Sequence, residues 1–124
     1  MIPYTVYKLL HLVGIFLLFS AVGGIALHAL NGGTRQSNTA RRLVAAIHGG
    51  ALFVILLGGF GMLARLQIVQ GMLPGWVWGK LLIWGAMVFI AVLPYRRPRA
   101  ARWVLLASPL LAGAAAYLAL YKPF

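Results

Sequence analysis

The chain has 124 residues, 63% hydrophobic and 9% charged, and its eleven lysines and arginines are accompanied by no aspartate or glutamate. A soluble domain carries about 25% charged residues, so this composition excludes an ordinary soluble domain and predicts a membrane protein. The lack of acids and cysteine excludes carboxylate metal sites, paired-carboxylate catalysis, Ser-His-Asp triads, thiolate clusters and disulfides.

Four apolar runs are separated by short polar stretches, and we expect helices at residues 3–30, 43–66, 76–93 and 103–121. Crossing a hydrocarbon core of about 30 Å takes roughly 20 helical residues, and a lipid-exposed backbone must satisfy its own hydrogen bonds. Short connections place consecutive helices antiparallel. The predicted fold is therefore all-α, a polytopic membrane protein in which residues 1–124 form a single four-transmembrane-helix up-and-down antiparallel bundle.

The first predicted helix carries two histidines at different depths. His11 lies seven residues after Tyr4, about 10 Å along a helix, and Lys8 lies one turn before it on the same face. His28 lies near the opposite end of this helix, one turn after Gly24. We therefore expect candidate ligands at two levels, that is, at two different depths in the membrane.

The second predicted helix follows the basic connection "NGGTRQSNTARR" and adds a third histidine. His48 lies about two turns after Arg41 and Arg42, and Arg65 lies at the end of this helix. Because the first two helices are consecutive and antiparallel, His28 and His48 can face one another. The glycine pair after His48 leaves room for a flat ligand.

The third predicted helix contains "PGWVWGKLLIW", in which Lys80 is surrounded by apolar, aromatic and glycine residues. Lys80 lies about 9 Å past Pro74, at the same level as His11, where Arg65 can join it. Since the chain has no acid to pair with this ammonium, Lys80 either snorkels toward lipid headgroups or faces an anionic ligand or partner.

The second basic connection, "YRRPRAAR", leads into the fourth predicted helix, where Pro109 is expected to cause a kink. The two basic connections hold seven of the eleven lysines and arginines on one side. By the positive-inside rule we expect both connections in the cytoplasm and both termini outside a bacterial-type inner (plasma) membrane. The partner of these arginines is then anionic lipid rather than nucleic acid.

A haem would account for both levels of candidates. Haem iron needs an axial imidazole, and its propionates need cations or water. We expect haem b with His11 as ligand, Lys80 as a propionate partner or second ligand, and Arg65 as a further cation. The alternatives are a haem between His28 and His48 with the neighbouring arginines on the propionates, and copper held by histidines and methionines.

Three stretches resemble a known group of proteins. "KLLHLVGIFLLF", "RRLVAAIHGGALFVILLGGFGML" and "WVWGKLLIW" are similar to small four-helix membrane proteins that include SirB-type proteins, CopD-type copper-resistance proteins and the haem-dependent, HemJ-like protoporphyrinogen oxidases. In those oxidases a first-helix histidine and a third-helix lysine are the functional pair, which the resemblance carries over to His11 and Lys80.

The chain also departs from these families. "IALHALNGG" offers only His28 where the oxidases have an arginine, a tyrosine and a histidine, and "AIHGG" lacks the proline and aspartate of SirB-type proteins. The resemblance therefore implies an architecture and no particular reaction.

Two function classes follow from the sequence. The first is a b-type haem protein that transfers electrons or handles porphyrin. The second is a non-catalytic accessory or assembly subunit, whose small-residue helix faces pack against a larger membrane complex or against copies of itself. A transporter ranks third because no coupling-ion site is present, and the sequence leaves open whether the protein is an enzyme.

Overall fold

The computed structural model describes residues 2–66 and 73–123, and these contain helices and no β-strand. The elements in chain order are α1 (Tyr4–Leu30), α2 (Arg41–Arg65), α3 (Gly75–Ile90), α4 (Leu93–Arg96), the 3-10 turn η1 (Pro98–Ala100) and α5 (Ala101–Tyr121). By length and composition, three helices can cross a membrane: α1, α2 and α5 with its η1 extension. With 16 residues, α3 is about 24 Å long.

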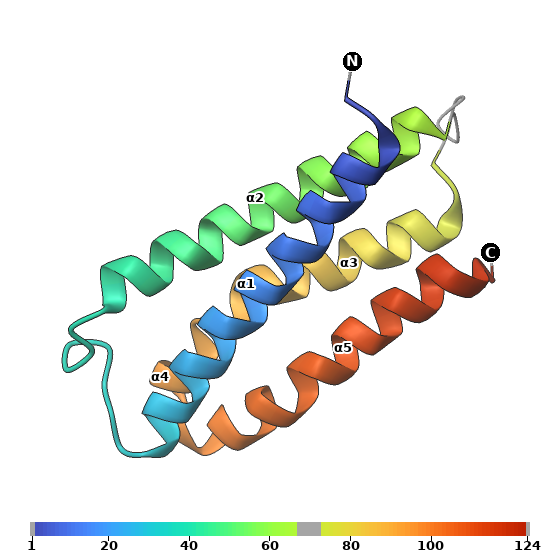
Figure 1. The fold of residues 1–124 in the computed structure, drawn as a ribbon. Helices are drawn as coiled ribbons and strands as arrows, with labels where there is room; N and C mark the ends of the chain where they lie inside the picture. Colours follow the sequence, from blue (N-terminus) through green and yellow to red (C-terminus); the bar gives the residue numbers. More distant parts are fainter. Residues whose placement is uncertain (1, 67–72, 124) are drawn as a thin grey trace.

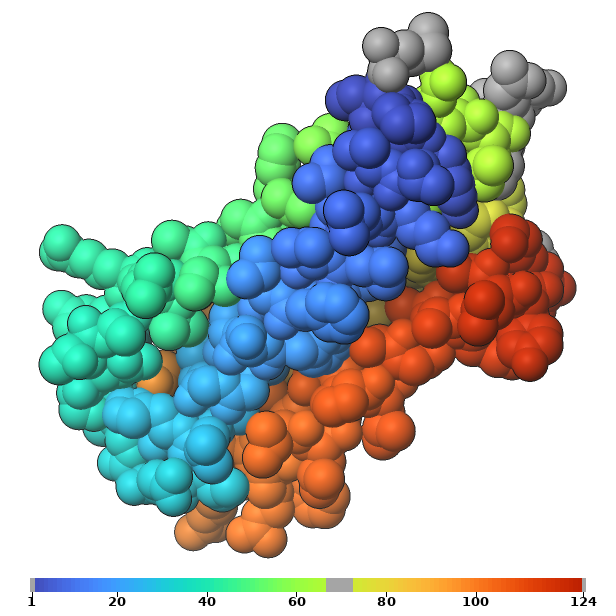
Figure 2. Space-filling model, viewed as in Figure 1, coloured from blue at the N-terminus to red at the C-terminus, as the bar shows by residue number. Residues whose placement is uncertain are grey.

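The long helices lie side by side, and consecutive ones run in opposite directions (Figure 1). α1 packs most extensively on α2, and α5 packs on both α1 and α3, whereas α2 and α3 contact one another little. In the space-filling view, α1 fills the region between α2 and α5 (Figure 2). The start of α1 and the end of α5 lie at one end of the molecule, and both arginine-rich connections lie at the other.

Glycines allow the close contact between α1 and α2. A Cβ atom at Gly58 would lie 2.8 Å from the backbone nitrogen of His11 and from the carbonyl oxygen of Tyr7, and one at Gly14 would lie 2.9 Å from the Ile55 side chain. Only a residue without a side chain permits such an approach of two backbones. The contact fixes where His11 lies relative to α2.

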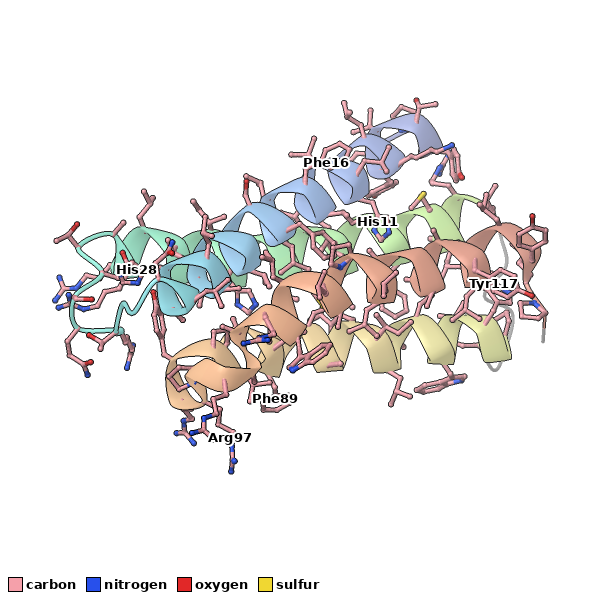
Figure 3. All side chains as sticks on the ribbon, turned by 90° about the horizontal axis from the view of Figure 1, so that it is seen from below. His11, Phe16, His28, Phe89, Arg97 and Tyr117 are labelled. Atoms are coloured by element: carbon pink, nitrogen blue, oxygen red, sulfur yellow. The ribbon has the colours of Figure 1, made fainter. Side chains whose placement is uncertain are left out.

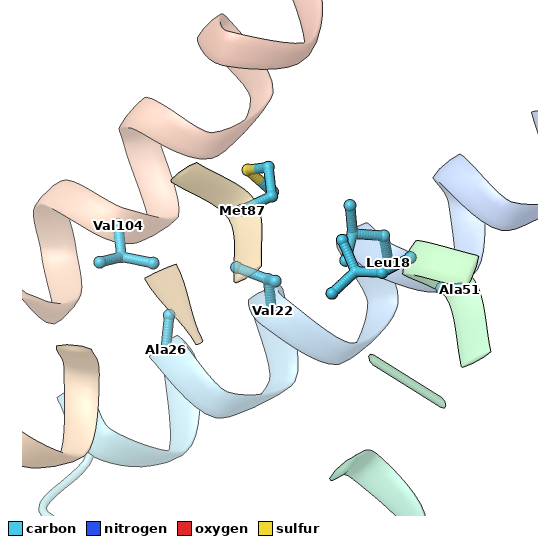
Figure 4. Packing of buried hydrophobic residues seen from close by; sticks show 7 residues of the cluster. Leu18, Val22, Ala26, Ala51, Met87 and Val104 are labelled. Carbon is cyan, nitrogen blue, oxygen red and sulfur yellow. The ribbon is translucent and has the colours of Figure 1, made fainter. Parts of the chain in front are cut away.

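A small apolar core joins all four long helices (Figure 4). Leu18, Val22 and Ala26 of α1 pack with residues of α2, α3 and α5, among them Met87 and Val104. Large apolar side chains also cover the outside: Phe16 is 69% exposed, Leu82 78% and Leu110 75%. Many exposed large apolar side chains, together with three helices long and apolar enough to cross a bilayer, indicate a membrane protein.

The third predicted helix differs from the observed one. α3 ends at Ile90, and a two-residue turn separates it from α4, in which Pro94 lies. Proline has no N–H to donate to the carbonyl of Ile90. In the turn before Pro94, the Val92 amide donates to the carbonyl of Phe89, three residues earlier, at 3.1 Å, rather than to the carbonyl four residues earlier as in an α-helix. The other expected ranges, 3–30, 43–66 and 103–121, agree with α1, α2 and α5 to within two residues, and α5 continues through Pro109.

Candidate ligand-binding cavity

A cavity of about 170 Å³ lies among α1, α2, α3 and the end of α5, and both His11 and Lys80 line it. Most of its wall is apolar or aromatic, with Phe60, Trp76 and Trp84 among the lining side chains. The cavity is partly open to the outside. Figure 3 shows His11 between helices, within the bundle. The structure therefore brings together the first-helix histidine and the third-helix lysine.

One hydrogen bond fixes the imidazole of His11. Its Nδ1 lies 2.8 Å from the carbonyl oxygen of Ile55, and a carbonyl only accepts, so Nδ1 carries the proton. The lone pair is then on Nε2, which makes no hydrogen bond within residues 2–66 and 73–123. Histidines that bind a metal through one ring nitrogen usually donate the N–H of the other to a carbonyl or carboxylate. Nε2 of His11 can therefore ligate a metal or accept a hydrogen bond.

Two ammonium groups line the same cavity. Lys80 is half-buried, and its Nζ has no hydrogen-bond partner within the described residues. Lys122 donates from Nζ to the carbonyl of Ala119 at 2.7 Å and lies 5.2 Å from the ring centroid of Trp76. Both ammonium groups carry positive charge and border one cavity, so they repel each other. A ligand with negative charge or electron-rich oxygens would relieve this repulsion.

Side-chain hydrogen bonds to backbone carbonyls connect α2 with α3 where the helices themselves contact little. Trp84 donates from its indole to the carbonyl of Leu52 at 3.0 Å, and His48 donates from Nε2 to the carbonyl of Met87 at 3.0 Å. Trp84 also forms part of the cavity wall. His48 thus fastens α2 to α3, farther from the end of the bundle where the cavity lies.

His28 has a different partner at the basic end of the molecule. Its Nδ1 lies 2.7 Å from the hydroxyl of Tyr95, which also accepts from the Asn38 amide at 3.1 Å. The ring of His28 meets Tyr95 edge-on, and a Cβ atom at Gly33 would overlap this imidazole. His28 therefore ties the first connection and α4 to the end of α1.

The remaining predicted site residues lie apart from the cavity. Arg65 is exposed at the end of α2, Lys8 is exposed on α1, and neither lines the cavity. His28 and His48 are held by separate partners, and among residues 2–66 and 73–123 no three histidines gather into a metal-holding group. A haem between His28 and His48 stays a prediction that these hydrogen bonds do not favour.

The sequence patterns do not single out two of the residues that line the cavity, Lys122 and Trp84. Trp84 is there only the last residue of the stretch "PGWVWGKLLIW". The signal available for Lys122 was its position one residue past an interfacial Tyr121, at the same end of the bundle as Trp76. Nothing in the sequence indicates the hydrogen bond of Trp84.

The side chains that line the cavity fit a haem, whereas the volume of the cavity is small for one. An imidazole with Nε2 available, two ammoniums and aromatic walls match an iron, two propionates and a planar ring. The cavity is smaller than the roughly 300–1,000 Å³ typical of pockets for drug-sized ligands. A macrocycle would therefore extend through the open side of the cavity.

No family model, curated protein or solved structure matches this chain. The resemblance to SirB-type, CopD-type and HemJ-like proteins therefore stays a prediction. The functional argument depends on the cavity and its residues.

Proposed function

We propose that the chain is a multi-pass plasma-membrane protein, a four-helix transmembrane bundle whose cavity binds haem b through Nε2 of His11. Residues 75–96, α3 with α4, provide the fourth span, because about 22 residues of helix reach roughly 33 Å. The arginine-rich end is cytoplasmic and both termini are outside. The observation that carries the haem proposal is the His11 imidazole, oriented by Ile55 with Nε2 available, in one cavity with two ammoniums.

Each cavity residue has a defined part in this proposal. Ile55 holds the His11 ring in one orientation and one tautomer. Lys80 and Lys122 would pair with the two propionates. Their positive charges otherwise have no acidic partner, because the chain contains no aspartate or glutamate. Trp76 and Trp84, which line the cavity, would exclude water from a bound ring. Haem would supply one-electron redox chemistry.

An absorption spectrum tests the proposal. The protein is purified in mild detergent with haem supplementation, and spectra are recorded oxidised and dithionite-reduced. We expect a stoichiometric Soret band that is lost in His11→Ala, reduced in Lys80→Ala and retained in His48→Ala. The His48 variant is a matched control because it too removes an imidazole bonded to a backbone carbonyl. A colourless wild type, or a band that survives in a folded His11→Ala protein, contradicts the proposal.

A second candidate function is that of an accessory or assembly subunit, and unused glycine pairs favour it. A Cβ atom at Gly23 or Gly24 of α1, or at Gly49 or Gly50 of α2, would meet no atom within 4 Å. Small residues exposed to lipid allow a further helix, from a larger complex or from another copy, to approach closely. The native mass in detergent tests self-association: an oligomer that dissociates in Gly23→Leu/Gly50→Leu supports it, and a monomeric wild type argues against it.

A further inference from the structure

A second hollow lies at the opposite end of the molecule from the His11 cavity. It is a groove of about 630 Å³ bordered by the first connection, the start of α2, the end of α3, and α4. Three arginines line it: Arg35 from the connection, Arg41 from the first turn of α2 and Arg96 from α4. Segments far apart in the sequence therefore bring three guanidinium groups to one groove.

The polar wall of this groove is held in place by hydrogen bonds. Asn38 donates to the Tyr95 hydroxyl at 3.1 Å, and its own side-chain oxygen accepts from the Ala40 amide at 2.9 Å. The backbone amide of Arg41 donates to the Asn38 carbonyl at 3.2 Å. Thr34 and Ser37 bond each other through side chains and backbone. The connection that carries Arg35 is therefore a loop ordered by its own hydrogen bonds and attached to α4 through Tyr95.

Nothing in the chain neutralises these arginines, because it contains no aspartate or glutamate. Guanidinium groups repel one another at short range, and their planar donor forks match phosphate oxygens. An external phosphate would therefore stabilise the groove and accept hydrogen bonds from more than one arginine.

The remaining wall of the groove is apolar. Ile25, Val44, Val88, Ala91 and Val92 line it together with the arginines. A free phosphate gains nothing from this wall, whereas a molecule with a phosphate at one end and a hydrocarbon chain at the other uses both parts. Basic pockets between helices on the cytoplasmic side of membranes bind lipid headgroups in this manner.

We propose that this groove, defined by Arg35, Arg41, Arg96 and the apolar wall, binds one anionic phospholipid of the cytoplasmic leaflet. Its headgroup phosphate pairs with the arginines, and an acyl chain lies along the apolar wall. The proposal rests on the proposed topology, with the arginine-rich end of the bundle in the cytoplasm, and is independent of whether the His11 cavity holds haem.

The test compares two variants that lose the same charge at the same end of the molecule. One is Arg35→Gln/Arg41→Gln/Arg96→Gln, and the control is Arg42→Gln/Arg97→Gln/Arg102→Gln, whose residues do not line the groove. Delipidated full-length protein in a neutral detergent is titrated with phosphatidylglycerol, phosphatidylcholine or inorganic phosphate, and bound lipid is counted by native mass spectrometry. We expect one phosphatidylglycerol on the wild type and on the control, and binding at least about tenfold weaker in the groove variant.

Each other outcome overturns the proposal. Equal loss in both triple variants means general electrostatic attraction, and equal binding of phosphatidylcholine means an apolar slot without charge recognition. If inorganic phosphate displaces the lipid at an equal concentration, the groove is an anion site without lipid specificity. If the groove variant fails to fold, the single substitution Arg35→Gln takes its place, because Arg35 lies outside any helix. Arg42→Gln is then the control.

Discussion

Replacing Gly58 with alanine is the sharpest test of how the cavity is positioned. A Cβ atom at this position would lie 2.8 Å from the backbone nitrogen and Cβ of His11 and from the Tyr7 carbonyl oxygen, while ordinary contact begins at 3.4 Å. α1 and α2 would therefore have to separate by several tenths of an ångström. All three obstructing atoms belong to the backbone or to a Cβ atom, so no side-chain rotation can relieve the clash.

The expected cost of this substitution follows from overpacking, which destabilises by about 1–3 kcal/mol. Gly50→Ala is the matched control, because it adds the same methyl group to the same helix and meets no atom within 4 Å. Both variants share the gain of up to about 1 kcal/mol in helix propensity, so their difference isolates the steric term.

The assay is reversible unfolding in mixed detergent micelles, followed by circular dichroism and tryptophan fluorescence. We expect Gly58→Ala to be less stable than Gly50→Ala by about 1–3 kcal/mol, which lowers the folding equilibrium constant roughly 5- to 150-fold. Equal stability of the two variants would refute the conclusion that backbone contact at Gly58 sets the distance between α1 and α2.

Two further substitutions test the hydrogen bonds that hold the bundle. Trp84→Phe removes the donor to the Leu52 carbonyl and should cost about 0.5–1.5 kcal/mol in the same unfolding assay. Trp78→Phe, at a site 55% exposed, is the control, and an equal effect of the two would argue against a structural hydrogen bond. Tyr95→Phe removes the hydroxyl shared by His28 and Asn38 and should cost about 1–3 kcal/mol, because it leaves part-buried polar groups unpaired. A stability equal to that of the wild type would show that this network does not hold the first connection.

The lack of acids shapes the whole interior of this protein. Each of three polar side chains, His11, His48 and Trp84, crosses between helices to a backbone carbonyl, and each of these bonds has α2 on one side. Where water is excluded, an unpaired donor costs several kcal/mol, and carbonyl oxygens are the acceptors that every helix offers. α2 is thereby linked to α1 on one side and to α3 on the other.

The sequence by itself determined where the helices lie and which residues share a level. Long apolar runs must form helices in lipid, and the arginines mark one end, so α1, α2 and α5 were predicted closely. The common depth of His11 and Lys80 followed from counting residues along two helices. The third helix was expected to end at residue 93, whereas α3 ends at Ile90, three residues earlier.

Only the tertiary structure decided which of these residues meet. The helices are apolar on all sides, so the sequence does not say which face of a helix turns toward its neighbours. Contact depends on rotation about the helix axis and on crossing geometry, which Gly14 and Gly58 set through close backbone approach. For this reason the sequence could not predict three contacts. These are the hydrogen bond of His11 to Ile55, the position of Lys122 in the cavity wall and the hydrogen bond between His28 and Tyr95.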